Sequence, residues 1–194
     1  GRDMQRPDES PENRLLKLAA QGDKQAFGIL YTQYLDEIFR FVYFKVGRVL
    51  TAEDITEDSF IKAWEHLPRI YKRDETVKNF RALLYRIANN LVIDHYRKKK
   101  PVENLNTEEP AHSPKPEATA IESQEIEQIT QALRKLKPVE QQIIILRLIN
   151  DLPHKEAASI MRISENHARV LLHRSLKKLR TIVINDGGMN AEEI

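Results

Sequence analysis

Apolar residues recur at three- and four-residue intervals along most of the chain, a spacing typical of amphipathic helices with one buried face. The first part of the chain predicts a short helix over residues 12–20, ended by Gly22, and a long helix over 24–46. Asp23 is placed to cap the start of the long helix, and Gly47 is placed to end it. We expect both helices to bury their apolar stripes in a common core. The stripe of the long helix is formed by Phe27, Leu30, Tyr31, Tyr34, Ile38, Phe41 and Val42.

The next part of the chain predicts two further helices of the same block. Thr51 opens a capping-box sequence, Thr-Ala-Glu-Asp, which predicts a helix to about His66 that is closed by Pro68. A loop over 69–78 then leads to a helix over 79–100. The apolar face of this last helix is formed by Phe80, Leu83, Leu84, Ile87, Ala88, Leu91 and Val92.

The periodic pattern disappears after residue 100. Residues 101–123 contain prolines at positions 101, 110, 114 and 116, together with frequent acidic residues. Such a segment has too little apolar surface to offset the entropy of ordering it. We therefore expect a flexible linker here.

A second helical block follows the linker. Its pattern predicts helices over residues 122–136, 139–149 (with Pro138 in the first turn), 154–161 and 165–182. The chain has only six glycines and few alternating runs of β-branched residues, which argues against sheet. The predicted fold is all-α, with two small helical domains at 12–100 and 124–182. The sequence does not indicate whether these domains pack together.

Composition limits the classes of function. The chain has 194 residues, 41% of them hydrophobic, and no apolar run of the ~20 residues that a membrane span needs. It contains no cysteine, which excludes disulfides and thiolate metal sites and is typical of a reducing cytoplasm. We find no paired histidine spacing for a metal, no phosphate-binding loop and no nucleophile–base pair, so we expect no metal, no cofactor, no small-molecule substrate and no enzymatic activity.

The predicted helix over 79–100 mixes cations, planar amides and aromatic rings on its polar positions. Cations pair with phosphates, aromatic rings stack on unpaired bases, and amides hydrogen-bond to base edges. This mixture is typical of a nucleic-acid surface, but it is equally compatible with a solvated helix that ends in a basic turn, and at this point both interpretations stay open. The residues that carry the prediction are Arg81, Tyr85, Arg86, Asn89, Asn90, His95 and Arg97.

Residues 154–173 have the pattern of a helix-turn-helix. Ala157 and Ala158 are small where two helices must cross closely, and Ser164 is placed to cap the second helix. In such a motif the second helix enters the major groove of DNA. An ordinary helical hairpin with a basic face is the alternative. The outward positions of the second helix are Asn166, His167, Arg169, Val170, His173, Arg174, Lys177 and Lys178.

Three stretches, in this order, resemble an extracytoplasmic-function sigma factor, the two-domain form of the bacterial sigma-70 family. Residues 52–67 are similar to the helix that docks on the clamp of core RNA polymerase. Residues 79–100 are similar to the helix that meets the −10 promoter element, and residues 138–180 to the domain that binds the −35 element. The resemblance covers roughly residues 12–182.

The resemblance implies roles for particular residues. Contact with core polymerase would come from Glu53, Asp54, Glu57, Asp58, Lys62 and Glu65. The loop before the −10 helix captures a flipped base in this family, which would involve Tyr71, Lys72, Arg73, Lys78 and Asn79. Arg169 is the expected base reader, and His173, Arg174, Lys177 and Lys178 are expected at phosphates.

The sequence departs from the family pattern at a few positions. Glu57 stands where Gln is frequent, and Leu83 replaces a frequent Trp. Val170 and Leu171 stand where Ser and Arg are common, so we expect apolar contact with thymine methyl groups to contribute more.

The resemblance also implies partners. These are core RNA polymerase (its beta-prime clamp and its beta subunit), promoter DNA and an anti-sigma factor, with the protein in the cytoplasm or held at the membrane by that anti-sigma factor. Two alternatives stay open. One is a sigma-like decoy that sequesters an anti-sigma factor, and the other is a stand-alone helix-turn-helix regulator.

Overall fold

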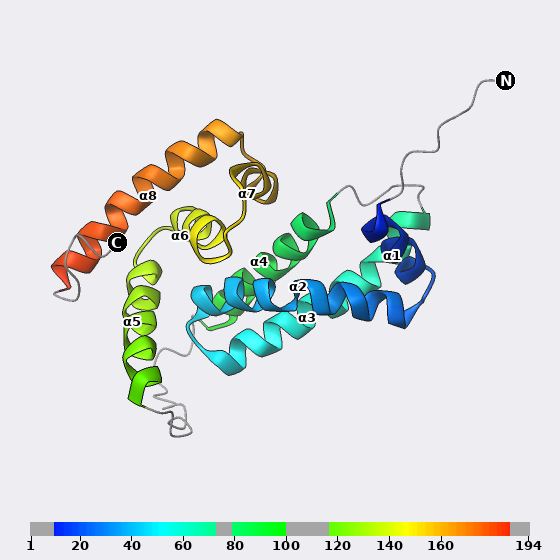
Figure 1. Ribbon diagram of the computed structural model, residues 1–194, viewed down its shortest axis with the longest axis horizontal. Helices are drawn as coiled ribbons and strands as arrows, with labels where there is room; N and C mark the ends of the chain where they lie inside the picture. Colours follow the sequence, from blue (N-terminus) through cyan, green and yellow to red (C-terminus); the bar gives the residue numbers. More distant parts are fainter. Residues whose placement is uncertain (1–9, 73–78, 100–116, 187–194) are drawn as a thin grey trace.

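The computed structural model describes residues 10–72, 79–99 and 117–186 of the chain, and every regular element within them is a helix (Figure 1). The side chains of residues 117–123 are not described. The first block holds four helices and the second block holds the rest. The first four are α1 Pro11–Ala20, α2 Lys24–Val46, α3 Val49–Lys72 and α4 Phe80–Lys99.

The predicted boundaries of α2 are confirmed by its caps. The Asp23 carboxylate accepts hydrogen bonds from the backbone N–H groups of Gln25 and Ala26, at 3.0 and 3.1 Å. At the other end Gly47 has a φ of +73°, and its N–H donates to the carbonyl of Tyr43 at 2.7 Å. The left-handed backbone conformation at this position favours glycine, because glycine carries no Cβ.

The predicted boundaries of α3 are wrong at both ends. The helix begins at Val49, before the capping-box sequence, and it continues through Pro68 to Lys72. A proline inside a helix costs ~3 kcal/mol because it removes one hydrogen bond and crowds the preceding turn. Leu67 is fully buried, and Ile70 and Tyr71 pack on the core beyond the proline. Full burial of Leu67 stabilises by ~1.5–3 kcal/mol, and the partial burial of Ile70 and Tyr71 adds to this, so that together they offset the cost.

The core of the first block is built around aromatic pairs that join α2 to α4. Phe41 and Tyr85 meet edge to face with ring centroids 4.9 Å apart, and Tyr34 meets Phe80 in the same way at 5.6 Å. Such pairs add to the stabilisation that burial itself provides. They hold α4 along α2 and so determine which face of α4 remains outside.

The second block contains α5 Glu117–Arg134, α6 Pro138–Ile144, the π-helical turn η1 Ile145–Ile149, α7 His154–Met161 and α8 Glu165–Asn185. The helix α5 begins at Glu117, inside the segment predicted as linker, so the end of that segment is helical. Residues 101–116 lie outside the described part of the chain. The predicted helices 154–161 and 165–182 are confirmed as α7 and α8.

The predicted helix over 139–149 forms as α6, but its last turn is the wider η1. The N–H of Asn150 donates to the carbonyl of Ile145, five residues back, at 2.9 Å. Single π-turns of this kind often occur at functional positions. Here the turn leaves Asn150 at the surface that faces the first block.

The two blocks are packed against each other (Figure 1). The α7 helix contacts α4, and both η1 and α5 contact α2, whereas α1 lies at the far end of the first block. A Cβ on Gly47 would lie 3.3 Å from Nη1 of Arg134 in α5. The residue that ends α2 is therefore also a point of close approach between the blocks.

A lysine is buried in the first block near this contact. The side chain of Lys45 is only 4% exposed, its Nζ donates to Oδ1 of Asn89 at 2.8 Å, and it lies 4.9 Å from the centre of the Phe41 ring. Burial disfavours the charged ammonium and lowers the pKa of Lys45 to about 7. The charge at this position therefore works against folding.

We expect Lys45→Met to stabilise the protein most at pH 7 and below. Between pH ~7 and the ordinary lysine pKa of ~10.4, the unfolded state binds more protons than the folded state. The free energy of unfolding of the natural protein therefore rises with pH over this window, by up to ~1.4 kcal/mol per unit, and the variant lacks this contribution.

The measurement is urea denaturation of both proteins at several pH values from 6.5 to 9.5. The difference in unfolding free energy should shrink as the pH rises, because all other titrating groups are shared. A difference that does not change with pH would contradict the assignment.

Candidate functional site

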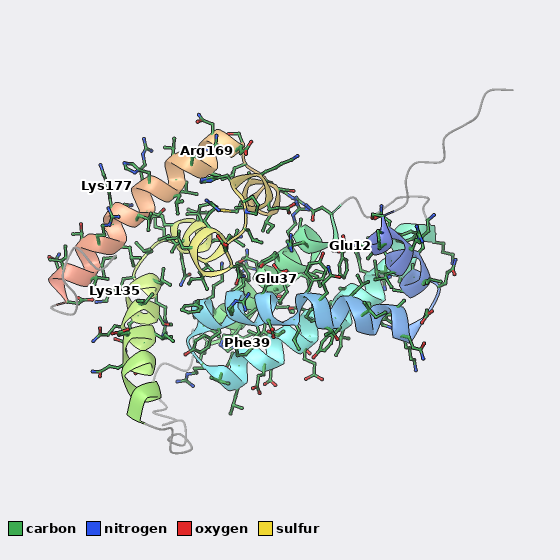
Figure 2. The ribbon with its side chains drawn as sticks, in the orientation of Figure 1. Glu12, Glu37, Phe39, Lys135, Arg169 and Lys177 are labelled. Carbon is green, nitrogen blue, oxygen red and sulfur yellow. The ribbon has the colours of Figure 1, made fainter. Side chains whose placement is uncertain are left out.

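A groove runs between α2 and α3 and has an apolar floor with an acidic rim. Its volume is about 470 Å³. Figure 2 shows Phe39 on the side of α2 that faces α3. The groove is lined by Tyr31, Leu35, Asp36 and Phe39 of α2 and by Glu53, Thr56 and Glu57 of α3.

The floor of the groove is ordered by ring packing. Phe39 stacks on Tyr43 with ring centroids 6.0 Å apart, and Tyr31 packs edge to face on Phe60 at 4.8 Å. The Thr56 hydroxyl is buried and has no hydrogen-bond partner within the described part of the chain. A buried hydroxyl without a partner is uncommon in folded proteins.

Of the six residues predicted to contact core polymerase, four line one or the other of two grooves. Glu53 and Glu57 line the α2–α3 groove, and Asp54 and Asp58 are exposed elsewhere on α3. Lys62 and Glu65 line a different groove of about 270 Å³ between α3 and α4. The other residues of this second groove are His66, Arg69, Leu83 and Ile87.

The α2 half of the first groove was not predicted from the sequence. The helical period assigned Tyr31 to the core face, yet its side chain is 36% exposed. The available signal was the run of apolar residues at 31, 35 and 39, spaced by four, beside the core stripe. When the apolar stripe of a helix is too wide to be buried in its own core, the part that remains exposed indicates a contact surface.

The prediction that Tyr85 faces DNA is wrong. Its side chain is fully buried, its hydroxyl donates to Oε2 of Glu37 at 2.7 Å, and it accepts from Nδ2 of Asn150 at 2.8 Å. Burial, and then the Glu37 carboxylate, raise the pKa of Tyr85, so the hydroxyl stays protonated as a donor. Tyr85 shares its helix face with Ala88 and Val92, which are also buried.

Several other predicted DNA contacts of α4 have partners within the protein. Arg81 forms an ion pair with Glu37 at 3.3 Å, and Asn89 accepts from Lys45. Asn79 caps α4 by accepting from the N–H of Ala82 at 3.0 Å. The Arg86 guanidinium donates to two backbone carbonyls of α7, those of Ser159 at 2.7 Å and Ile160 at 3.5 Å.

The C-terminal half of α4 is open. Asn90 and Arg97 are exposed, as are Lys98 and Lys99. His95 is half-buried, and burial lowers its pKa, helped by the nearby cations Lys99 and Arg48. At the end of α3, Tyr71 is half-buried and Lys72 is exposed, whereas Arg73 and Lys78 lie outside the described residues.

The second helix of the helix-turn-helix is α8, and its capping is as predicted. The Ser164 hydroxyl accepts from the N–H of His167 at 3.0 Å. Arg162, in the turn, has a φ of +55°, the left-handed conformation that glycine more often supplies in this motif. The buried Ala168 then packs α8 against α7, which leaves the opposite side of α8 in solvent.

The predicted DNA-facing residues of α8 are all exposed. They are Asn166, His167, Arg169, Val170, His173, Arg174, Lys177 and Lys178. Figure 2 shows Arg169 and Lys177 along the outer side of this helix. Leu171 is half-buried against the core, as expected for packing.

Two of these cations also form ion pairs within the second block. Arg169 pairs with Glu165 at 3.6 Å, with both side chains about half exposed, and such a surface pair contributes only ~0–1 kcal/mol. Lys178 is held more firmly, because its Nζ lies 2.6 Å from the buried carboxylate of Glu140. The hydrogen bond from Lys178 lowers the pKa of Glu140 and keeps it charged. Arg169 is therefore freer than Lys178 to contact a ligand.

Within the described residues, no helix is long and apolar enough to cross a bilayer, and no three histidine or carboxylate side chains gather as a metal site.

Both helical blocks of the chain match known protein families. The family described as Sigma-70 region 2 matches residues 30–102, and the family described as Sigma-70, region 4 matches residues 126–179. The matches include α4 and the helix-turn-helix.

Two characterised relatives are similar over most of the chain. One is the ECF RNA polymerase sigma factor BldN of Streptomyces coelicolor, 33% identical over 89% of this chain and 66% of its own length. The other is the ECF RNA polymerase sigma factor SigW of Bacillus subtilis, 30% identical over 85% of this chain and 92% of its own length.

Solved structures share the fold. The structure of CnrH in complex with the cytosolic domain of CnrY matches with a TM-score of 0.69 and 23% sequence identity. The match covers 90% of this chain and 98% of the CnrH chain. The sigma factor RpoE of Bartonella quintana, in complex with the anti-sigma factor NepR, has a TM-score of 0.63 and 20% identity over 82% of this chain and 97% of that chain.

Proposed function

The chain belongs to the extracytoplasmic-function group of the sigma-70 family, and on that premise we propose that it directs core RNA polymerase to promoters with −10 and −35 elements. It would act by binding and by helping to melt DNA, with no catalytic activity of its own. The working location would be the cytoplasm, where polymerase is found.

The observation that carries the proposal is the α2–α3 groove. An apolar floor and the acidic residues Asp36, Glu53 and Glu57 suit an amphipathic helix with a basic edge. We assign this groove to a helix of the beta-prime clamp of core polymerase. Apolar contact supplies affinity in such a site, and the rim charges supply orientation.

The second block would bind the −35 element through α8. Asn166, Arg169 and Val170 are exposed in its N-terminal half and would enter the major groove, and its later cations would face phosphates. The exposed end of α4, with Asn90 and Arg97, would contact the −10 region, and the beta subunit would lie against the second block. Because one chain joins both readers, binding of one raises the effective concentration of the other.

An anti-sigma factor is the other partner we propose. The related CnrH and RpoE structures are complexes with CnrY and with the anti-sigma factor NepR. A protein that fills the α2–α3 groove would exclude polymerase directly. The decoy alternative is disfavoured by the exposed cations of α8, which such a protein would not need. The stand-alone regulator is disfavoured by the groove, which a DNA-binding module would not need.

We expect Phe39→Ala to weaken binding to sigma-free core polymerase about 30-fold, the result of losing ~2 kcal/mol from a central aromatic contact. The measurement is the affinity of a fluorescently labelled protein for core enzyme. Ile29→Ala is the matched control, because Ile29 is an exposed apolar residue of the same helix that does not line the groove. Equal affinities for the two variants would contradict the assignment of the groove.

We expect Arg169→Ala to reduce initiation at a cognate promoter by the equivalent of ~1–3 kcal/mol and to relax the base preference within the −35 element. The measurement is transcription from templates that differ at single −35 positions. Lys177→Ala is the control, since loss of a phosphate contact should weaken all templates about equally. A template preference that Arg169→Ala leaves unchanged would remove Arg169 as a base reader.

A further inference from the structure

Among the described residues, the one hydrogen bond of the buried Lys45 side chain goes to a predicted DNA contact. Lys45 is 4% exposed, and its Nζ lies over the ring of Phe41 in the core of the first block. The same Nζ donates to Oδ1 of Asn89 at 2.8 Å, which joins α2 to α4. Lys45 forms no ion pair with any residue that the structure describes. The ammonium is thus partnered by one amide oxygen and one ring.

The placement of Lys45 costs stability. Burial without a carboxylate partner disfavours the ammonium and lowers the pKa of Lys45 to about 7. A methionine would fill similar space without a charge, so folding does not require a lysine at this position. Groups that work against folding are concentrated where function depends on them. Lys45 is therefore a candidate for a role other than packing the core.

The hydrogen bond from Lys45 fixes the orientation of the Asn89 amide. Asn89 is half-buried on α4, next to the exposed Asn90. Its Oδ1 is turned inward to the ammonium, whereas its Nδ2 is not buried and donates to no group in the described part of the chain. An ammonium has donors and no acceptor, so it pairs with the amide oxygen and not with the amide nitrogen. The cation therefore leaves the two N–H donors of Asn89 free for a ligand.

An amide held in this way reads bases differently from a free one. A free asparagine recognises adenine with both of its polar atoms, because Oδ1 accepts from N6 while Nδ2 donates to N7. The oxygen of Asn89 is engaged by Lys45, so only donors remain for a base edge. Donors alone favour the keto bases guanine and thymine, whose O6 and O4 atoms are acceptors.

We propose that Lys45 is a positioning residue for −10 recognition. It holds the Asn89 amide with its donors outward, so that Asn89 selects guanine or thymine over adenine at one position of the −10 element. This inference rests on the proposed function, because it assigns Asn89 to promoter DNA. Lys45 itself touches no DNA in this assignment. Its effect is a preference between bases, which a lysine with a purely structural role would not change.

Initiation on a matrix of templates tests the role of Asn89. The templates carry each of the four bases at every −10 position of a cognate promoter, and the protein is used with core polymerase. The natural protein should favour guanine or thymine over adenine at one position. Asn89→Ala should lower that preference about fivefold, as expected for one hydrogen bond, and leave the other positions unchanged. Asn89→Asp should lose the preference as well, because a carboxylate has no donor.

Lys45→Met tests the positioning role on the same templates. The variant keeps Asn89 but frees its oxygen, so the preference for guanine or thymine over adenine should fall at least threefold at the same position. Combined with Asn89→Ala, it should have no further effect on that preference, since both changes remove one interaction. Lys24→Met is the matched control. It removes the same charge from an exposed position of α2, so any loss should be equal for all templates.

The outcomes separate this inference from the proposed function. An unchanged base preference in Lys45→Met, or an effect of Lys45→Met that persists in the Asn89→Ala background, overturns the positioning role. Unchanged preferences in both Asn89 variants, or adenine as the favoured base at the coupled position, overturn it as well. If the natural protein fails to initiate with an active core enzyme, the proposed function itself fails, and this inference fails with it.

Discussion

The buried hydroxyl of Tyr85 is the interaction on which the arrangement of this molecule depends. The ring of Tyr85 packs on Phe41 in the core of the first block, and its hydroxyl lies between the carboxylate of Glu37 and the amide of Asn150. A hydroxyl buried at this depth needs partners, and it takes one from each block. The same residue therefore orients α4 within its own block and specifies where the second block is placed.

The polymerase and promoter surfaces follow from how the two blocks bury their helices. Packing of α2 and α4 through aromatic rings turns one apolar edge of α2 outward, where it forms the groove with α3. Packing of α8 on α7 through Ala168 leaves the cationic side of α8 in solvent. Each surface is the part of a helix that its own core cannot cover.

Features fixed by neighbours in sequence could be predicted, and features fixed by distant contacts could not. The caps at Asp23 and Ser164 are local hydrogen bonds, so the starts of α2 and α8 were identified correctly. Pro68 was interpreted as a helix end because the sequence pattern does not show that Ile70 and Tyr71, which follow it, pack on the core. Tyr85 looked like a DNA-stacking ring because its partner Asn150 lies far along the chain. The groove residue Tyr31 was assigned to the core for a similar reason. Helical periodicity alone does not show how many of the apolar positions on a helix the core can cover.

Transcription from genomic DNA of the source organism tests the central claim most directly. The protein would be added to sigma-free core polymerase, and the 5′ ends of the transcripts would be mapped. The account predicts discrete new start sites that share two upstream motifs, one near −10 and one near −35. No new start sites, with an active core enzyme and a working control sigma factor, would contradict it.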